Sequence, residues 1–343
     1  MPRIVCIGSK SSASLIVKGF SSQRERITAI CPTTDSGSST GIIRNNFFLP
    51  APGDLRAIIT FFSDLKGKDA LLKQLFEYRF QPEESKDLEG MALGNLVIVA
   101  LTGITGGFEK AIKSASRLLK VKGKVLPVTR ANTQLCAQLI DEAVVAGEVE
   151  VRKIGKPAIK RVFLEDEETT TTLACIRAIK EADLICLGPG CLYTSLIPCL
   201  LVRGINEAMA KTKGKITYIC NHTTTPGQTD GFTVLRHVEE IQRYLKKASL
   251  DYCLITDRIA PPEMIRAYQR DMISFIIPTE EEIKKIKEMG IKPILSDFIE
   301  RGWKGKRSLP KLDTIRHDPL RVRAALMRIY REGVKGPRRK GAR

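Results

Sequence analysis

Seven short β-rich runs of the chain, several of them apolar throughout, alternate with segments whose apolar residues repeat at helical spacing. Continuous apolar runs, unlike alternating ones, are typical of central strands in a parallel sheet that is covered on both faces. The candidate strands cover residues 3–8, 27–33, 124–129, 183–189, 215–221, 251–256 and 273–278. The pattern predicts an α/β protein with a three-layer α/β/α architecture, a mainly parallel sheet and right-handed crossovers.

Two regions interrupt this alternation. Residues 55–119 are mostly helical in pattern, and residues 133–164 suggest a hairpin with a further strand, which we interpret as a small β insertion. We therefore expect one domain over residues 1–318, followed by a basic C-terminal helix and a disordered tail over residues 319–343. The helix is indicated by apolar residues at its characteristic spacing, namely Val322, Ala325, Leu326, Ile329 and Tyr330.

The composition is that of an ordinary globular protein, with 43% apolar and 27% charged residues. No apolar run is long enough to span a bilayer, and the chain enters a strand-like segment at once, which leaves no room for a secretion signal. The nine cysteines are scattered without a C-x-x-C pair, which argues against a disulfide framework or a zinc site. We expect a cytoplasmic protein.

The formal charge of +18 is concentrated near the C-terminus, where residues 301–343 hold 15 Lys and Arg against 3 Asp and Glu. An anionic partner for this tail, either a nucleic acid or a membrane surface, is therefore one functional hypothesis. A basic tail alone is weak evidence for such a partner. The loops that follow the candidate strands indicate a second candidate site.

Small and hydroxyl-bearing residues follow four of the candidate strands, over residues 8–14, 33–41, 188–195 and 221–232. In an open parallel sheet, ligands bind at the carboxyl ends of the strands, where helix N-termini also offer free N–H groups to phosphate. The four loops together therefore predict a site for a phosphorylated ligand. Neither a G-x-G-x-x-G fingerprint nor a G-x-x-x-x-G-K-[ST] loop is present.

Two carboxylates in this part of the chain have competing interpretations. Asp35, in the stretch TTDSGSSTG, either forms an ordinary turn or holds a hard cation, and Asp54 either caps the helix that follows it or joins Asp35 on Mg²⁺. In the second case Arg56 is placed to contact a phosphate oxygen. Asn95 lies in an apolar helix and needs a polar partner, and Asp230 is either a helix cap or a ligand contact.

Several longer motifs resemble the CofD-like family. They are PGDLR, LFEYRF, LGNLVIVALTGITGGFEKAI, GKVLPVT, RVFLE, ADLICLGPGCLYTSLIPCLLVRGI, PGQTDGF and RHDP. The similarity runs over nearly the whole chain and is closest to the gluconeogenesis factor branch. It implies a Rossmann-like fold and a nucleotide-type ligand at the strand ends.

The two branches of the family imply different functions. The gluconeogenesis factors bind a uridine diphosphate sugar and support cell-wall and cell-shape homeostasis during growth on gluconeogenic carbon. The 2-phospho-L-lactate transferases instead move a phospholactyl group from a guanosine diphosphate-linked donor to a deazaflavin alcohol with Mg²⁺. We expect a nucleotide-sugar-binding regulatory protein of the first kind, with a phosphoryl-type transferase as the alternative. A homo-oligomer is compatible with either.

The resemblance also assigns the candidate site. Asp35 and Asp54 match the acidic positions that the transferase branch associates with metal and, if the protein is an enzyme, with catalysis. The predicted ligand contacts, taken from the resemblance and the four loops together, are Gly8, Ser9, Lys10, Ser38, Ser39, Arg56, Asn95, Gly188, Pro189, Gly190, Tyr193, Thr194, Ser195, Asn221, Gly227, Thr229 and Asp230.

The chain departs from the family pattern at several of these loops. The usual G-G-G-T-G of the first loop is GSKSS, and an acidic pair is reduced to Asp35-Ser36. A usual His before LGN is absent, Cys191 and Cys199 replace Ser and Asn, and Gln228 replaces Glu. Two carboxylates and an imidazole are lost, which favours ligand binding over Mg²⁺-dependent catalysis.

Overall fold

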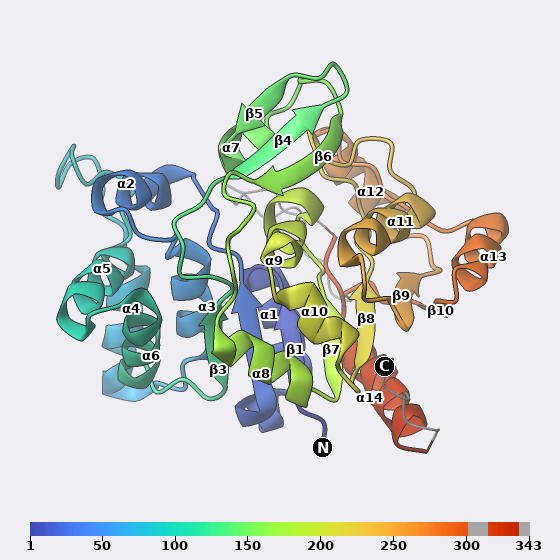
Figure 1. The fold of residues 1–343 in the computed structure, drawn as a ribbon, viewed down its shortest axis with the longest axis horizontal. Helices are drawn as coiled ribbons and strands as arrows, with labels where there is room; N and C mark the ends of the chain where they lie inside the picture. The colour runs from blue at the N-terminus through green and yellow to red at the C-terminus, as the bar shows by residue number, and fades with distance from the viewer. Residues whose placement is uncertain (301–314, 336–343) are drawn as a thin grey trace.

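The structure, a computed structural model, describes residues 1–300 and 315–335 and is built around a seven-stranded sheet (Figure 1). The strand order is β10-β9-β8-β7-β1-β2-β3, and every neighbouring pair is parallel. The strands are β1 (Ile4–Ile7), β2 (Ile27–Cys31), β3 (Lys124–Pro127), β7 (Leu184–Leu187), β8 (Lys215–Ile219), β9 (Tyr252–Thr256) and β10 (Lys292–Ser296). The predicted parallel α/β sheet is confirmed.

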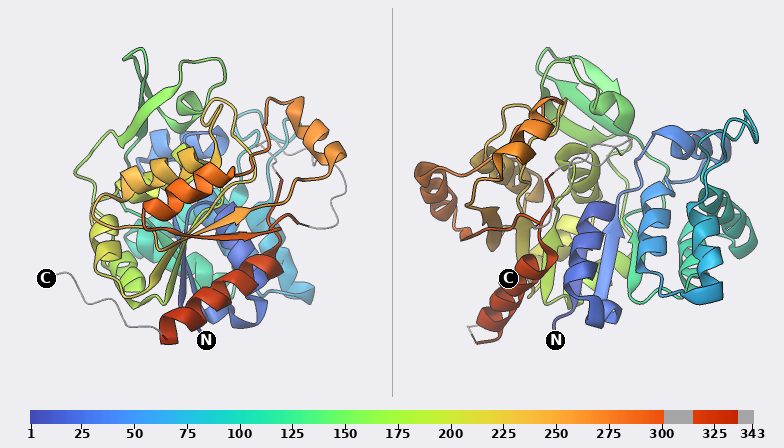
Figure 2. Two further views of the ribbon diagram at one scale, coloured as in Figure 1. Left: turned by 90° about the vertical axis from the view of Figure 1, so that its right-hand side faces the viewer. Right: turned by 180° about the vertical axis from the view of Figure 1, so that it is seen from behind.

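Helices cover both faces of this sheet, which is why the central strands are apolar on both sides (Figure 2). One layer contains α8 (Leu173–Glu181), α9 (Ile197–Leu201), α10 (Ile205–Ala210), α11 (Val234–Leu245) and α13 (Glu280–Glu288). The other contains α1 (Lys10–Gly19), α3 (Gly53–Phe62), α4 (Ala70–Glu77), α5 (Leu93–Thr105), α6 (Phe108–Leu118) and α14 (Pro319–Lys335). Two further helices, α2 (Ser38–Phe47) and α12 (Pro262–Gln269), lie outside these two layers.

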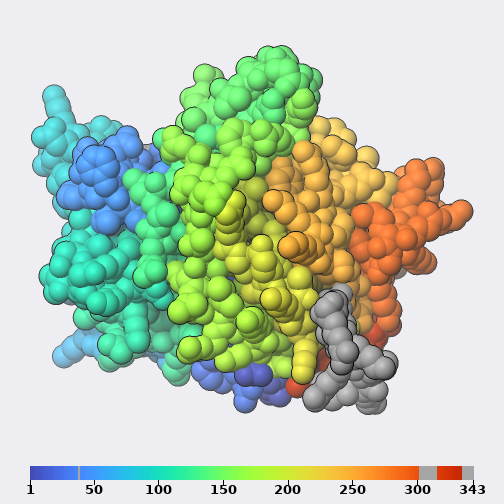
Figure 3. All heavy atoms as spheres, in the orientation of Figure 1, coloured from blue at the N-terminus to red at the C-terminus, as the bar shows by residue number. Residues whose placement is uncertain are grey.

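The predicted β insertion is present as a separate antiparallel sheet with the order β5-β4-β6. It consists of β4 (Leu135–Leu139), β5 (Val144–Ala146), the short helix α7 (Glu148–Val151) and β6 (Ile159–Leu164). Figures 1 and 3 show it at one end of the molecule, beyond the carboxyl ends of the central strands. The insertion is therefore placed directly above the loops in which the sequence predicts a site.

One predicted strand is wrong. Residues 273–278 form no strand of the main sheet; within them only Phe275 makes an isolated bridge, to Thr223. The last strand is β10 instead, an edge strand with half-exposed residues and Pro293. An edge strand is not apolar throughout and tolerates proline, so the pattern of a buried strand does not find it.

The predicted C-terminal helix is α14, which packs on α1 through its apolar side. Val322, Leu326 and Ile329 are buried, and the guanidinium of Arg323 lies over the ring of Phe20. The tail predicted to be disordered, residues 336–343, lies outside the described residues. Within the described ranges no single helix is long and apolar enough to cross a bilayer; the sharply bent pair α5 and α6 passes that test jointly, by length and composition alone.

Candidate functional site

The order of the strands creates a switch point between β1 and β7. From β1 the chain proceeds to β2 and β3 on one side, and it returns to place β7 on the other side of β1. In doubly wound sheets, the loops that leave such a pair of strands diverge and open a crevice for ligands. Here those loops are residues 8–12 and residues 188–191, two of the four loops that the sequence selects.

The loops after β1 and β7 are in direct contact. The hydroxyl of Ser12 donates a hydrogen bond of 3.0 Å to the carbonyl oxygen of Pro189. Gly190 adopts φ +145°, and a Cβ atom there would lie 3.3 Å from Oγ of Ser9. A side chain at Gly190 would therefore crowd the first loop. Lys10 is exposed at the start of α1.

The loop after β8 joins the same group. The side chain of Asn221 makes two hydrogen bonds with the backbone of Gly190, accepting from its N–H at 3.1 Å and donating to its carbonyl at 2.9 Å. Gln228, farther along the loop after β8, accepts a hydrogen bond of 3.3 Å from the hydroxyl of Thr194, which follows β7. Four side-chain contacts thus hold three predicted loops, those after β1, β7 and β8, at one edge of the sheet, which we call the strand-end rim.

The loop after β2 lies at the same edge, and Asp35 both shapes it and faces α3. One carboxylate oxygen accepts a 2.9 Å hydrogen bond from the N–H of Gly37, which is the turn that small residues predict here. The other oxygen would be 3.3 Å from a Cβ on Gly53, the residue before Asp54. Asp54 lies in the first turn of α3, whose N-cap position is Pro52, so it is not the cap that one interpretation expects.

Two predicted ligand contacts, Arg56 and Asn95, bond to each other instead of facing an open space. The guanidinium Nε of Arg56 donates to the amide oxygen of Asn95 at 3.0 Å, and another nitrogen donates to the carbonyl of Phe76. Asn95 in turn donates to Oγ of Ser39 at 3.2 Å. Burial lowers the pKa of Arg56 to about 10. This buried network connects α2, α3 and α5 and provides the partner that Asn95 requires.

The remaining predicted residues differ in how far they reach the rim. Tyr193 is buried and donates to Glu240 of α11 at 2.9 Å; burial, and then Glu240, raise the pKa of its phenol. The hydroxyl of Thr229 accepts from the N–H of Thr225. Asp230 is exposed and caps nothing, because Thr233 is the N-cap of α11. Gly8 and Gly188 lie at the ends of β1 and β7, and Ser195 is partly buried. Gly227 contacts the insertion. Ser38 is the first residue of α2, and its side chain lies outside the described part of the structure.

The β insertion brings to the rim three charged residues that the sequence does not predict. Glu148 is 7% exposed and, like Asp35, lies against Gly37. Arg152 pairs with Glu148 at 3.3 Å, and Lys156 donates to the carbonyl of Gly227. These residues fall within an expected insertion whose position over the sheet cannot be inferred from periodicity, so no sequence signal links them to the rim.

The family model described as "2-phospho-L-lactate transferase CofD" matches residues 4–299, most of the chain. The chain belongs to the CofD family. Gluconeogenesis factor from Bacillus subtilis (strain 168) is 36% identical over 331 residues, which cover 96% of this chain and 99% of that protein. The gluconeogenesis factor of Halalkalibacterium halodurans is 34% identical over 324 residues, 94% of this chain and 95% of the relative.

Solved structures share the fold of this chain. A crystal structure of a UPF0052 family member from Bacillus halodurans superimposes with a TM-score of 0.84 at 32% identity and covers 95% of this chain and 99% of that one. A second crystal structure from the same organism gives 0.83 at 33% identity, with the same coverage. The CofD-like fold predicted from the motifs is therefore confirmed.

Within this family, the donor set at the rim suits Mg²⁺ only in combination with a ligand. Among residues 1–300 and 315–335, no three His, Cys, Asp or Glu side chains form a metal-binding group. Asp35 and Asp54 are two carboxylates on neighbouring segments, and Mg²⁺ is commonly held by one or two carboxylates together with phosphate oxygens. A Mg²⁺ at this place would therefore need phosphate oxygens of a ligand besides these two carboxylates.

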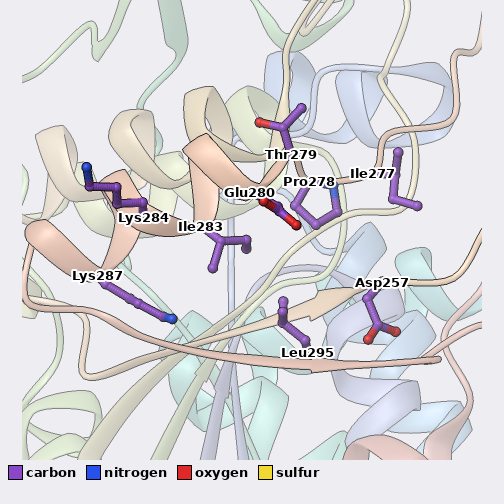
Figure 4. Close-up of a pocket in the computed structure, with 9 residues that line it drawn as sticks. All are labelled: Asp257, Ile277, Pro278, Thr279, Glu280, Ile283, Lys284, Lys287 and Leu295. Carbon is purple, nitrogen blue, oxygen red and sulfur yellow. The ribbon is translucent and has the colours of Figure 1, made fainter.

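A separate hollow of about 560 Å³ lies between α13, the edge strand β10 and the residue that follows β9, Asp257 (Figure 4). It shares no residue with the predicted site. Its lining includes Asp257, Glu280, Lys284 and Lys287, and their charged ends reach solvent around an apolar floor. This hollow is a second place where a small molecule could be tested, and it provides a control for the rim.

Proposed function

We propose that this CofD family member binds a nucleotide sugar, of the uridine diphosphate type, at the strand-end rim. Its role would be regulatory, in carbon metabolism and in cell-wall and cell-shape homeostasis. The proposal depends mainly on one observation: hydrogen bonds connect the loops after β1, β7 and β8 at the switch point of the sheet. The gluconeogenesis factor names of the two full-length relatives support the regulatory role.

The chemistry of the rim supports a diphosphate as the part of the ligand that is bound there. Helix α1 begins at Lys10, and its N-cap residue Ser9 makes no side-chain hydrogen bond to the first turn. The N–H groups of that turn and the positive end of the helix dipole therefore face the switch point, where they favour an anion. Ser9, Lys10 and Asn221 add a hydroxyl, an ammonium group and an amide to these backbone donors.

A transferase is the second candidate, because the matching family model carries that description. In that case Asp35 and Asp54 would hold Mg²⁺, which would neutralise charge on the phosphoryl group, while the rim loops position the two substrates. The resemblance implies a Glu at position 228, an acidic residue at position 36 and a His before Leu93, and this chain has Gln228, Ser36 and Ala92 there, so three ionisable groups are missing from these loops. We therefore favour binding without turnover.

Calorimetric titration with UDP-glucose, in the presence and absence of Mg²⁺, tests the proposal. We expect saturable binding by the wild-type protein and a large loss of affinity in Asn221→Leu, which breaks the connection to Gly190. Lys284→Ala with Lys287→Ala, in the separate hollow of Figure 4, should leave the affinity unchanged. A loss of binding in this control instead of in Asn221→Leu would move the site to the hollow. Phospholactyl transfer to a deazaflavin alcohol would establish the transferase.

A further inference from the structure

The β insertion contacts the rim at two separate places. On one side, the hydroxyl of Ser36 accepts a hydrogen bond from the N–H of Val149 at 3.3 Å. On the other side, a Cβ on Gly227 would lie 2.7 Å and 2.6 Å from the carbonyl oxygens of Arg152 and Lys153. Gly227 has φ +74°, so both its backbone conformation and the close approach of the insertion require glycine. Helix α7 and the residues after it thus bridge the loops that follow β2 and β8.

Arg152 is the first cation that this bridge brings to the rim. Its side chain is 29% exposed, and its guanidinium is 3.3 Å from a carboxylate oxygen of the buried Glu148. Both side chains act on Cys191 in the loop after β7: burial is the main cause that raises the pKa of this thiol, Glu148 raises it further, and Arg152 lowers it. The ion pair therefore lies within electrostatic range of the switch-point loop.

Lys156 is the second cation. Its ammonium group donates to the carbonyl oxygen of Gly227, and burial lowers its pKa while the nearby carboxylate of Asp230 raises it. A partly buried ammonium with a single backbone carbonyl among its described hydrogen-bond partners retains donors for an anion. Together, Arg152 and Lys156 lie on opposite ends of the segment that contacts Gly227.

Two other cations near the rim are already engaged by the fold. The guanidinium of Arg44 bonds to Asn132 and to the carbonyl oxygens of Thr34, Asp35 and Thr133, and that of Arg56 bonds to Asn95 and Phe76. Both are buried, and burial lowers the pKa of each. The arginine that the sequence selects for a phosphate contact is thus engaged in holding helices together.

An independent feature at the same place is the side chain of Gln228. It is 4% exposed and its oxygen accepts from Thr194. Its amide nitrogen has no acceptor within hydrogen-bonding distance among the described residues, but the side chain lies near the thiol of Cys191, whose pKa burial raises and Gln228 lowers slightly. A buried donor that lacks an acceptor destabilises the fold, because it has lost its hydrogen bond to water without replacement. An acceptor oxygen of a bound ligand, beside Cys191 and Arg152, would remove this destabilisation.

We propose that Arg152 and Lys156 of the β insertion bind the anionic group of the ligand, and that Glu148 is the intramolecular counter-ion of Arg152 until the ligand binds. The inference depends on the proposed function, because it assigns the cationic half of that same site. It also assigns a function to the insertion, which adds no strand to the seven-stranded sheet but places positively charged side chains at the strand-end rim. The ligand class is a diphosphate-bearing molecule, so affinity should follow the phosphates.

The experiment compares Arg152→Gln and Lys156→Gln with the wild-type protein, using UDP-glucose, UDP and uridine as probes in calorimetry. The matched control is Lys153→Gln, which lies between the two but pairs with Glu150 and has a side chain that is 66% exposed. We expect each of the two variants to bind UDP-glucose and UDP 10- to 100-fold more weakly, with Lys153→Gln within about twofold of wild type. Uridine, which lacks phosphate, should show no difference among the proteins.

The variant Glu148→Gln tests whether Arg152 contacts the ligand or has a purely structural role. Removing the counter-ion frees Arg152, so we expect tighter binding of UDP, whereas loss of a merely structural ion pair would weaken it or leave it unchanged. Thermal unfolding midpoints for all variants establish that each is folded. If the wild-type protein binds UDP-glucose and the Arg152 and Lys156 variants bind it equally well, this inference is overturned while the proposed function stands. Absence of wild-type binding would overturn both.

Discussion

The buried pair of Arg56 and Asn95 makes a quantitative prediction about why these two polar residues are present. The substitution Asn95→Leu removes the acceptor for Nε of Arg56, at 3.0 Å, and the donor to Ser39, at 3.2 Å. Arg56 is 7% exposed, so water does not replace the lost acceptor. Arg56→Met removes the charge itself and keeps most of the apolar stem.

The expected cost follows from the kinds of bonds that are lost. A hydrogen bond to a charged group contributes about 1.5–3 kcal/mol and a neutral one about 0.5–1.5 kcal/mol, so Asn95→Leu should lower the free energy of unfolding by about 3 kcal/mol. Arg56→Met leaves the oxygens of Asn95 and Phe76 without their donor and should cost about 2–4 kcal/mol. In the double variant the two side chains are both apolar, so the costs should fall short of their sum by about 2 kcal/mol.

Urea unfolding followed by far-UV circular dichroism measures these quantities, with the shift in midpoint converted at a common slope. A double-mutant cycle isolates the coupling between the two side chains from the other effects of each substitution. Coupling energies below about 0.5 kcal/mol would refute the view that Asn95 and Arg56 form one unit. UDP-glucose affinity, measured on the same variants, tests the contact role that the sequence predicts for both residues.

Three further predictions concern the rim, the buried histidines and the tail. Asp35→Asn keeps the acceptor for the N–H of Gly37 but removes the charge, so UDP-glucose affinity in calorimetry should lose its Mg²⁺ dependence while the unfolding midpoint is retained. His222 and His317 stack at 3.7 Å, and burial lowers the pKa of His317 to about 4 and that of His222 well below its usual value. Between pH 6.5 and about 4 the unfolded chain binds a proton on His317 that the folded chain does not bind. The stability should therefore be full above pH 6.5 and fall by up to about 1.4 kcal/mol per pH unit from His317, with His222 acting in the same direction; urea titrations across this range should show a smaller slope in His317→Phe. Truncation after Lys335 should leave the affinity for UDP-glucose unchanged. Any salt-dependent binding of a nucleic acid or of anionic vesicles should become weaker in the truncated protein. An unaltered salt dependence would exclude the tail as the anion-binding element.

The sequence predicts the central sheet well because burial on both faces leaves a simple signature. Strands such as β1 and β7, buried at every residue, stand out as continuous apolar runs. Strand β10 lies at an edge, contains Pro293 and is only half-buried, so the same criterion selects residues 273–278 in its place. The extent of the β insertion follows from turn and strand signals, but its contact with Ser36 and Gly227 depends on how separate segments pack, which periodicity does not encode.

For the candidate site, chain position predicts location better than it predicts side-chain partners. The loops after β1, β2, β7 and β8 lie at one edge because parallel strands all end there, and the structure places them as expected. Arg56 and Tyr193 occupy predicted segments, yet the first reaches Asn95 and the second reaches Glu240 on α11. A motif fixes where a side chain begins; the direction in which it extends depends on helices that are remote in sequence.

The distribution of charge around the rim bears on the choice between binding and turnover. Asp35 and Asp54, the two carboxylates proposed to hold Mg²⁺, come from the loop after β2 and from the first turn of α3, whereas Arg152 and Lys156 come from the insertion. A diphosphate can be neutralised from both sides in such an arrangement, and this requires no proton transfer. The three histidines lie in the interior. His222 and His317 stack on each other, His237 is buried in α11, and burial lowers the pKa of all three. General acid–base chemistry needs a group that titrates near the working pH within reach of the substrate. Burial disfavours the charged form of the three imidazoles, so the positive charge that would face a diphosphate in the proposed complex comes from Arg152 and Lys156.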